Sequence, residues 1–189
     1  MNPLAVIALV VGSAVAVGAL ARKRNPVVQW LTDFWAGRVQ PPAEFVRRMT
    51  DGCTWLVEGG ELAPVNGDGL DVHPNPGSDI RAVTDCVVSW VGTIPGRGPA
   101  LGLSSLHQSD ESFLYVGIDY MVGLGGFVAG DQVIGQARQG TYGSNETLFT
   151  FAVQNTMAAD PNSGARPINA RAWLRENGTQ ATAFVRGWV

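Results

Sequence analysis

Few residues in this chain have the types and spacing that catalysis or metal binding requires. The histidines are His73 and His107 and the cysteines are Cys53 and Cys86, and none of them has a partner at the short spacing of a zinc-ligand pair. Asp71 precedes His73 by two residues, so on a strand both side chains would point to one face and form at most a weak cation site. The pattern predicts no cysteine metal site, and it leaves open whether the thiols are free or form a disulfide.

Serine and phosphate chemistry find equally little support. Ser104 and Ser105 have no surrounding G-x-S-x-G motif and no matched histidine. The glycine-rich run at residues 123–130 lacks the Lys-Ser/Thr pair of a phosphate-binding loop. Asp79 and Asp85 are interpreted as turn residues and not as a general acid/base pair. We therefore expect no catalytic residues and no cofactor.

The composition favours one small, β-rich domain. A chain of 189 residues can hold one ordinary domain and a membrane anchor, but not two well-cored domains as well. With 13 basic and 16 acidic residues the net charge is −3, which argues against nucleic acid as a partner. The 24 glycines and 11 prolines occur in a chain that is 46% hydrophobic, so they indicate short strands joined by tight turns.

Residues 3–21 carry no charged side chain and are predicted to form a transmembrane helix. At about 1.5 Å per residue this run would extend about 28 Å, close to the hydrocarbon thickness of a bilayer. The alternative is a cleaved signal peptide, since Ala19-Leu20-Ala21 is similar to a cleavage site, although no basic residue precedes the run. Arg22-Lys23-Arg24 completes an anchor at residues 1–24 and places the following domain on the cytoplasmic side, or on a face derived from it.

Residues 25–52 are expected to form a short helical neck. Asn25-Pro26 supplies a cap and a first-turn proline, and apolar residues then recur at helical spacing as far as Trp35. A second short helix is predicted at residues 43–49. Trp30 and Trp35 could lie at the level of the lipid headgroups or pack against the following domain.

From Cys53 onward, short apolar runs alternate with turn signals and predict strands. Residues 69–72 read GLDV, and residues 76–92 read PGSDIRAVTDCVVSWVG. Later come GGFVAGDQVIG at residues 125–135 and LFTFAV at residues 148–153. In this order and spacing, the segments resemble the lysostaphin/LytM-type zinc peptidase domain, a fold of antiparallel β-sheets. The resemblance implies a mainly β, lysostaphin-like sandwich at residues 53–175, followed by a C-terminal strand at residues 176–189; the alternative is an unrelated glycine-rich sandwich or barrel.

The resemblance also implies where a metal site would be, and most of its ligands are missing. Family members hold zinc through a histidine four residues before the motif aspartate, through that aspartate, and through the second histidine of an H-x-H pair. Here the aspartate is Asp71, but Gly67 and Thr150 stand at the two histidine positions. Leu148 and Gly117 replace the two histidines that assist catalysis in the family. Because catalytic zinc needs about three protein donors, we expect no bound metal.

These observations predict a protein that is not an enzyme. The expected function is that of a membrane-anchored structural or interaction protein, whose partners are membrane lipid and other proteins of a membrane or virion assembly. It would lie in a bacterial inner membrane, as an envelope regulator, or in the membrane of a bacteriophage virion, as a structural component. Peptidoglycan binding through aromatic faces such as Trp55, Trp90 and Tyr120 is one alternative. An active, divergent zinc peptidoglycan endopeptidase is the other.

Overall fold

The computed structural model describes residues 25–63, 67–140, 147–162 and 164–184. The predicted anchor at residues 1–24, with its span at 3–21, lies outside these residues. Within them, no helix is both long enough and apolar enough to cross a membrane.

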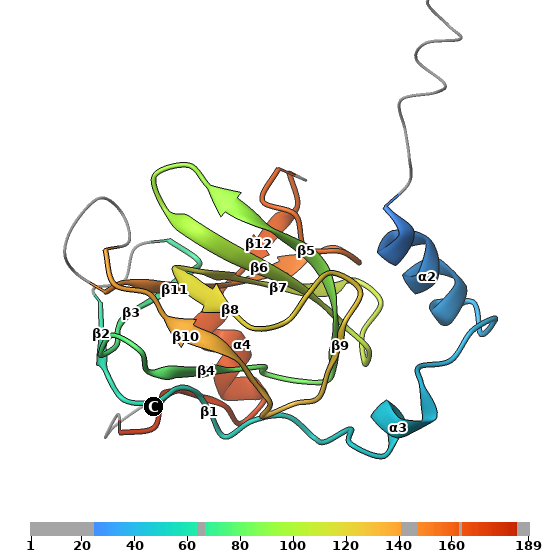
Figure 1. Ribbon diagram of the computed structural model, residues 1–189, viewed down its shortest axis with the longest axis horizontal. Coiled ribbons are helices and arrows are strands. Elements are labelled where there is room, and N and C mark those ends of the chain that lie inside the picture. Colours follow the sequence, from blue (N-terminus) through green and yellow to red (C-terminus); the bar gives the residue numbers. More distant parts are fainter. Residues whose placement is uncertain (1–24, 64–66, 141–146, 163, 185–189) are drawn as a thin grey trace, which may run out of the picture.

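Two β-sheets pack face to face and account for most of the described chain (Figure 1). The smaller sheet contains, in order, β13 (Gln180–Thr182), β1 (Trp55–Val57), β4 (Asp79–Arg81), β10 (Val133–Ala137) and β8 (Ile118–Tyr120). The larger sheet contains, in order, β2 (Glu61–Leu62), β3 (Leu70–His73), β11 (Phe149–Asn155), β7 (Glu111–Val116), β6 (Gly98–Ser105), β5 (Cys86–Ile94) and β9 (Phe127–Val128), with β12 (Arg166–Ile168) paired to β11. Of the pairings within the described ranges, only that of β1 with β13 is parallel. The predicted mainly β, antiparallel architecture is confirmed.

The core lies between the two sheets because the strands alternate inward and outward side chains. In β3, Leu70 and Val72 are buried, whereas Asp71 and His73 point to the opposite face. β11 repeats the pattern with fully buried phenylalanines at positions 149 and 151. Aromatic rings from β7 and β11 meet in this layer, where the Tyr115 and Phe151 ring centroids are 5.2 Å apart. The alternation leaves polar residues of β3 and β11 on the outer face of the larger sheet.

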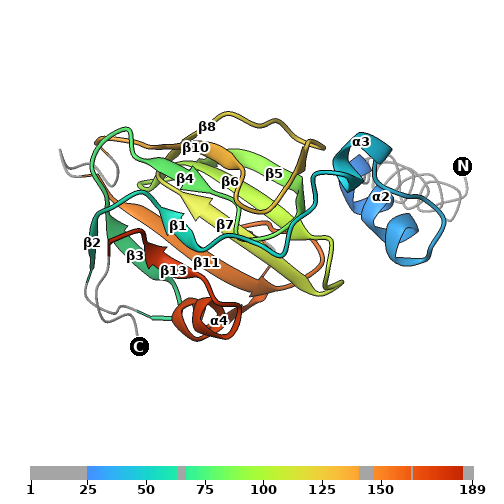
Figure 2. The ribbon, with the colours of Figure 1, turned by 90° about the horizontal axis from the view of Figure 1, so that it is seen from below.

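The neck forms the two helices that were predicted, and both pack against the sandwich. α2 (Pro26–Trp35) begins at Asn25, whose side chain accepts a hydrogen bond from the Val27 N–H. α3 (Ala43–Val46) is shorter than the predicted helix at residues 43–49. Figure 2 shows α2 and α3 together on one flank of the sandwich, away from α4. Buried Val27, Leu31 and Phe45 form a second apolar cluster with residues of the β domain.

Asp85 joins the neck to the β domain. Its side chain is 0% exposed, although the sequence indicated an ordinary turn residue. One carboxylate oxygen accepts hydrogen bonds from the backbone N–H groups of Thr50, at 3.1 Å, and Gly130, at 2.9 Å. The other oxygen lies 3.0 Å from His107 Nε2. The segments around Gly52 and Gly130 lie so close together that a Cβ at Gly130 would be 2.8 Å from Gly52 Cα. This close approach is why the turn at Gly130 requires glycine.

The C-terminal part differs from the sequence-based expectation. Residues 170–176 form a helix, α4 (Ala170–Glu176), which was not predicted. Its N-terminal signal is Asn169, whose side chain accepts a hydrogen bond from the Ala172 N–H. Within the described part of the strand expected over residues 176–189, β13 forms and residues 183–184 form a turn. Residues 185–189 lie outside the described chain, so that part of the expectation stays a prediction. β6 was also not predicted, because its glycines and serines are typical of loop sequences.

Replacing Asp85 by alanine tests the role of this carboxylate. Asp85→Ala leaves two backbone N–H groups without their buried acceptor, so we expect the free energy of unfolding to fall by about 3 kcal/mol. Asp119 is the matched control, because its carboxylate forms an exposed ion pair with Arg138. Asp119→Ala should cost no more than about 0.5 kcal/mol in the same urea titration. Equal losses in the two variants would contradict the structural role of Asp85.

Candidate functional site

The positions that correspond to the family's metal site come together on the outer face of the larger sheet. Asp71 in β3 stands directly opposite Thr150 in β11. On the other side of β11, Thr150 is paired with Val116, which is followed by Gly117. Leu148 immediately precedes β11, two residues before Thr150. Three strands therefore bring together four of the five positions that the sequence singled out.

At the centre of this face, Asp71 and Thr150 bind each other. Thr150 Oγ1 donates a hydrogen bond of 2.6 Å to Asp71 Oδ1. Thr150 is only 6% exposed, whereas Asp71 is half-buried. A hydrogen bond to a carboxylate is stronger than one between neutral groups, and here it holds the Asp71 side chain toward β11. One oxygen of the Asp71 carboxylate is thus engaged within the protein.

The remaining positions supply no side-chain donor. Gly67, four residues before Asp71, has a φ of +78° and is exposed. Gly117 has a φ of +81°, and its backbone N–H donates to the carbonyl oxygen of Pro99. Among the described residues, no three His, Cys, Asp or Glu side chains are grouped so that they could hold a metal ion. One carboxylate and one hydroxyl do not fit zinc, which binds imidazole, thiolate and carboxylate groups, usually three or four together.

The two histidines lie in different places. His73 ends β3 on the same face as Asp71, as the spacing predicted, but its Nδ1 lies 3.3 Å from the carbonyl oxygen of Thr147. His107 follows β6 and contacts Asp85, so it takes part in the contact between the neck and the β domain. The structure does not bring them together.

Beyond Asp71, the outer face of the larger sheet is apolar and partly covered by the chain itself. Buried Ala100, Leu114 and Val116 form a separate apolar cluster there. A Cβ at Gly102 would lie 2.9 Å from the Cβ of Ala159, so the segment after β11 crosses this face in close contact with β6. Backbone and alanine methyl groups therefore occupy this part of the face.

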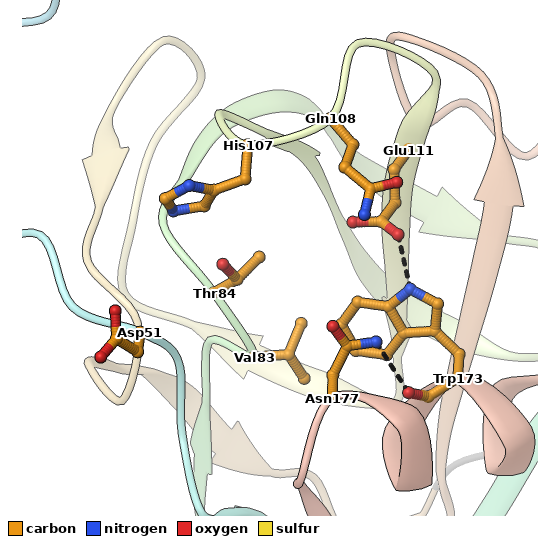
Figure 3. A pocket seen from close by; sticks show the side chains of 8 residues that line it. All are labelled: Asp51, Val83, Thr84, His107, Gln108, Glu111, Trp173 and Asn177. Atoms are coloured by element: carbon orange, nitrogen blue, oxygen red, sulfur yellow. Dashed lines mark hydrogen bonds between the residues drawn. The ribbon is translucent and has the colours of Figure 1, made fainter.

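A polar hollow of about 200 Å³ lies at the other end of the sandwich, near α4 (Figure 3). Glu111 reaches it from the start of β7 and is 6% exposed. The Trp173 indole N–H donates a hydrogen bond to the Glu111 carboxylate. His107 and Asn177 line other parts of the hollow. Neither Glu111 nor Trp173 was singled out from the sequence, because the residues that meet here are 62 positions apart.

Burial raises the pKa of the Glu111 carboxyl group above its usual value, and the hydrogen bond from Trp173 offsets part of this rise. A carboxyl group with a raised pKa in the folded state stabilises the fold most at pH values below its unfolded pKa. This contribution is lost as the pH rises through the folded-state value. Glu111 therefore makes the protein less stable at neutral pH than in mild acid.

Glu111→Gln should remove this pH dependence while leaving an amide oxygen that can accept the Trp173 hydrogen bond. We expect the free energy of unfolding of the wild type to decline from about pH 4.5 toward pH 7 by more than that of the variant. Urea titrations of both proteins across this range measure the difference. Parallel curves would show that Glu111 does not titrate with a raised pKa.

Both thiols are buried and free. Burial, followed by the nearby charge of Asp131, raises the pKa of Cys53 to about 12. Burial likewise raises the pKa of Cys86 well above its usual value. Because the thiolate is the reactive form, neither cysteine has the environment of a nucleophile.

No protein-family model and no curated protein sequence matches this chain. Solved structures do match it. Lysostaphin from Staphylococcus simulans aligns with a TM-score of 0.51 and 21% identity over 66% of this chain and 51% of the lysostaphin chain. LytU aligns with a TM-score of 0.50 and 17% identity over 63% of this chain and 87% of that chain. A putative glycyl-glycine endopeptidase, LytM, from Ruminococcus gnavus has a TM-score of 0.50 at 13% identity, over 72% of this chain and 65% of that chain.

These likenesses concern architecture, and the alignment spans about half of the lysostaphin chain. They agree with the mainly β, lysostaphin-like fold that the sequence motifs indicated. The described part of this chain thus has the fold of the lysostaphin/LytM-type peptidases.

Proposed function

We propose that this chain is a non-catalytic structural or interaction protein, built on a peptidase-like β domain and anchored to a membrane by residues 3–21. The observation that carries the first part is the hydrogen bond between Thr150 and Asp71. It joins the side chains at two positions that the resemblance assigns to zinc ligands, and these two side chains could not hold a zinc ion by themselves.

The chemistry of peptide-bond hydrolysis supports this proposal. A catalytic zinc ion lowers the pKa of its bound water to about 7, and it needs about three protein ligands and an open position to do so. Asp71 is the one protein ligand that remains at the corresponding positions among the described residues. Function does not follow from fold when the residues of a site have changed, so the domain is better explained as a surface for contacts.

The proposed partners are membrane lipid and other proteins of a membrane or virion assembly. The uncharged run at residues 3–21 supplies the anchor, and the basic flank at residues 22–24 favours a domain on the cytoplasm-derived side. The net charge of −3 gives no reason to include nucleic acid.

Zinc analysis together with a peptidoglycan-release assay tests the loss of catalysis. We expect the purified wild type to contain no stoichiometric zinc and to release no peptide from cell walls. Gly67→His combined with Thr150→His places two histidines at the ligand positions beside Asp71. A Cβ added at Gly67 would meet no atom within 4 Å, but its φ of +78° is one that a side chain rarely adopts, so the local backbone must relax in this variant. This double variant should bind zinc with a Kd near or below about 1 μM, equivalent to about 8 kcal/mol.

Asp71→Ala in the double variant is the matched control and should abolish the restored binding. Zinc in the wild type, together with wall hydrolysis that both a chelator and Asp71→Ala abolish, would overturn the proposal. Failure of the double variant to bind zinc, in a protein that keeps the urea unfolding midpoint of the Gly67→Ala control, would show that residues 67 and 150 are not placed as assigned.

The anchor is tested by reconstituting the full chain in phosphatidylcholine vesicles and washing them with alkaline carbonate. We expect the protein to stay with the lipid, because a spanning helix resists extraction, whereas peripheral contacts do not. In cells, protease should reach the β domain only after the cytoplasmic face is exposed. A domain that is digested from the outside of intact spheroplasts would contradict the proposed topology.

A further inference from the structure

An apolar hollow of about 290 Å³ lies where the neck meets the β domain. We call it the neck hollow, and its lining comes from α2, β5, β9 and the β8–β9 loop. Pro26 and Trp30 contribute from α2, and Leu124 and Phe127 contribute from the β domain. None of the residues that line it carries a charge. An apolar hollow of this kind calls for an apolar occupant.

The loop beside the neck hollow is exposed and apolar. Met121 is 63% exposed and Leu124 is 50% exposed, and Tyr120 at the end of β8 is 38% exposed. These three are among the five large apolar side chains that are exposed in the described residues. Leu124 and Gly125 of this loop line the neck hollow together with Pro26 and Val27 of α2. The apolar loop and the start of α2 therefore form one continuous surface.

The start of α2 is fixed relative to the sandwich. Asn25 donates a side-chain hydrogen bond of 3.1 Å to the carbonyl oxygen of Ser89 in β5. Val27 and Leu31 are buried against the β domain. The Trp30 ring packs edge-on against Phe127, with centroids 5.1 Å apart. Any constraint on the chain just before Asn25 therefore constrains the orientation of the whole domain.

The sequence supplies that constraint. Residues 22–25 are the only link between the apolar run that ends at residue 21 and the first residue of α2. The five Cα–Cα steps from residue 21 to Pro26 span at most about 18 Å when fully extended. If residues 3–21 cross a bilayer, Pro26 and the neck hollow beside it lie within that distance of the hydrocarbon boundary, close enough for this part of the domain to rest against the headgroup layer.

We propose that the neck hollow and the loop at residues 120–124 form a membrane-contact surface that inserts among the lipids around the anchor and receives acyl-chain groups. This inference rests on the anchor in the proposed function and adds the face that the domain turns toward the bilayer. Trp30 fits the assignment, since tryptophan is favoured at the boundary between lipid and water. The surface would hold the domain against the membrane in one orientation.

Site-specific labelling of the full chain in phosphatidylcholine vesicles tests this assignment. Leu124→Cys carries a polarity-sensitive NBD label, and the native thiols at positions 53 and 86 are buried. Glu176→Cys on exposed α4 is the control, because Figure 2 shows α4 well separated from α2. With lipids that bear doxyl quenchers on their acyl chains, we expect quenching at position 124 to exceed that at position 176 by about threefold or more. Met121→Cys should behave like Leu124→Cys.

The outcomes separate this inference from the anchor on which it rests. Equal quenching at positions 124 and 176, in a protein that still resists alkaline extraction, would overturn the membrane-contact surface alone. Loss of the protein from the vesicles on extraction would overturn the anchor and the inference with it. An NBD label at position 124 could instead report the same apolar environment in detergent as in vesicles, in a protein that dimerises with rising concentration. This result would assign the surface to a second copy of the chain and also overturn the inference.

Discussion

The buried carboxylate of Asp85 holds together three segments that are distant in the sequence. It accepts hydrogen bonds from the backbone at Thr50 and Gly130, and it contacts His107. A fully buried carboxylate is costly unless its lone pairs are engaged, so the neck, the β9–β10 turn and the β6–β7 loop must keep these positions for the fold to be stable. Through this constraint the neck becomes part of the domain, and the start of α2 has a defined orientation.

At the outer face of the larger sheet, the strand pairing places a hydrogen bond between two positions that the sequence resemblance assigns to metal ligands. The pairing of β3 with β11 sets Asp71 opposite Thr150, whatever side chain stands at position 150. A histidine there would offer a nitrogen lone pair to a cation, whereas threonine offers a hydroxyl proton to the carboxylate. The backbone arrangement is thus compatible with catalysis or with its absence, and the side chains decide between them.

Local patterns in the sequence were enough to predict much of the fold. Short apolar runs within residues 76–92, 125–135 and 148–153 indicated β5, β10 and β11, and Asn25-Pro26 indicated the start of α2. Prediction failed where the local signal was weak or ambiguous. β6 contains glycines and serines that become buried only because β5 and β7 flank it. α4 is seven residues long, which is too short for a clear helical periodicity.

The amino-acid order alone determines the net charge, the apolar run at residues 3–21 and the sheet-forming pattern. It also determines that no histidine stands at positions 67, 117, 148 and 150. These are properties of composition and local spacing, which do not depend on how the chain folds. The packing of the folded chain establishes that the buried Asp85 carboxylate joins the neck to the β domain, that Glu111 accepts a hydrogen bond from Trp173, and that Thr150 donates one to Asp71. Each of these contacts joins residues that are far apart in the chain, and their energies depend on burial and distance, which arise only when the two sheets and the neck pack together.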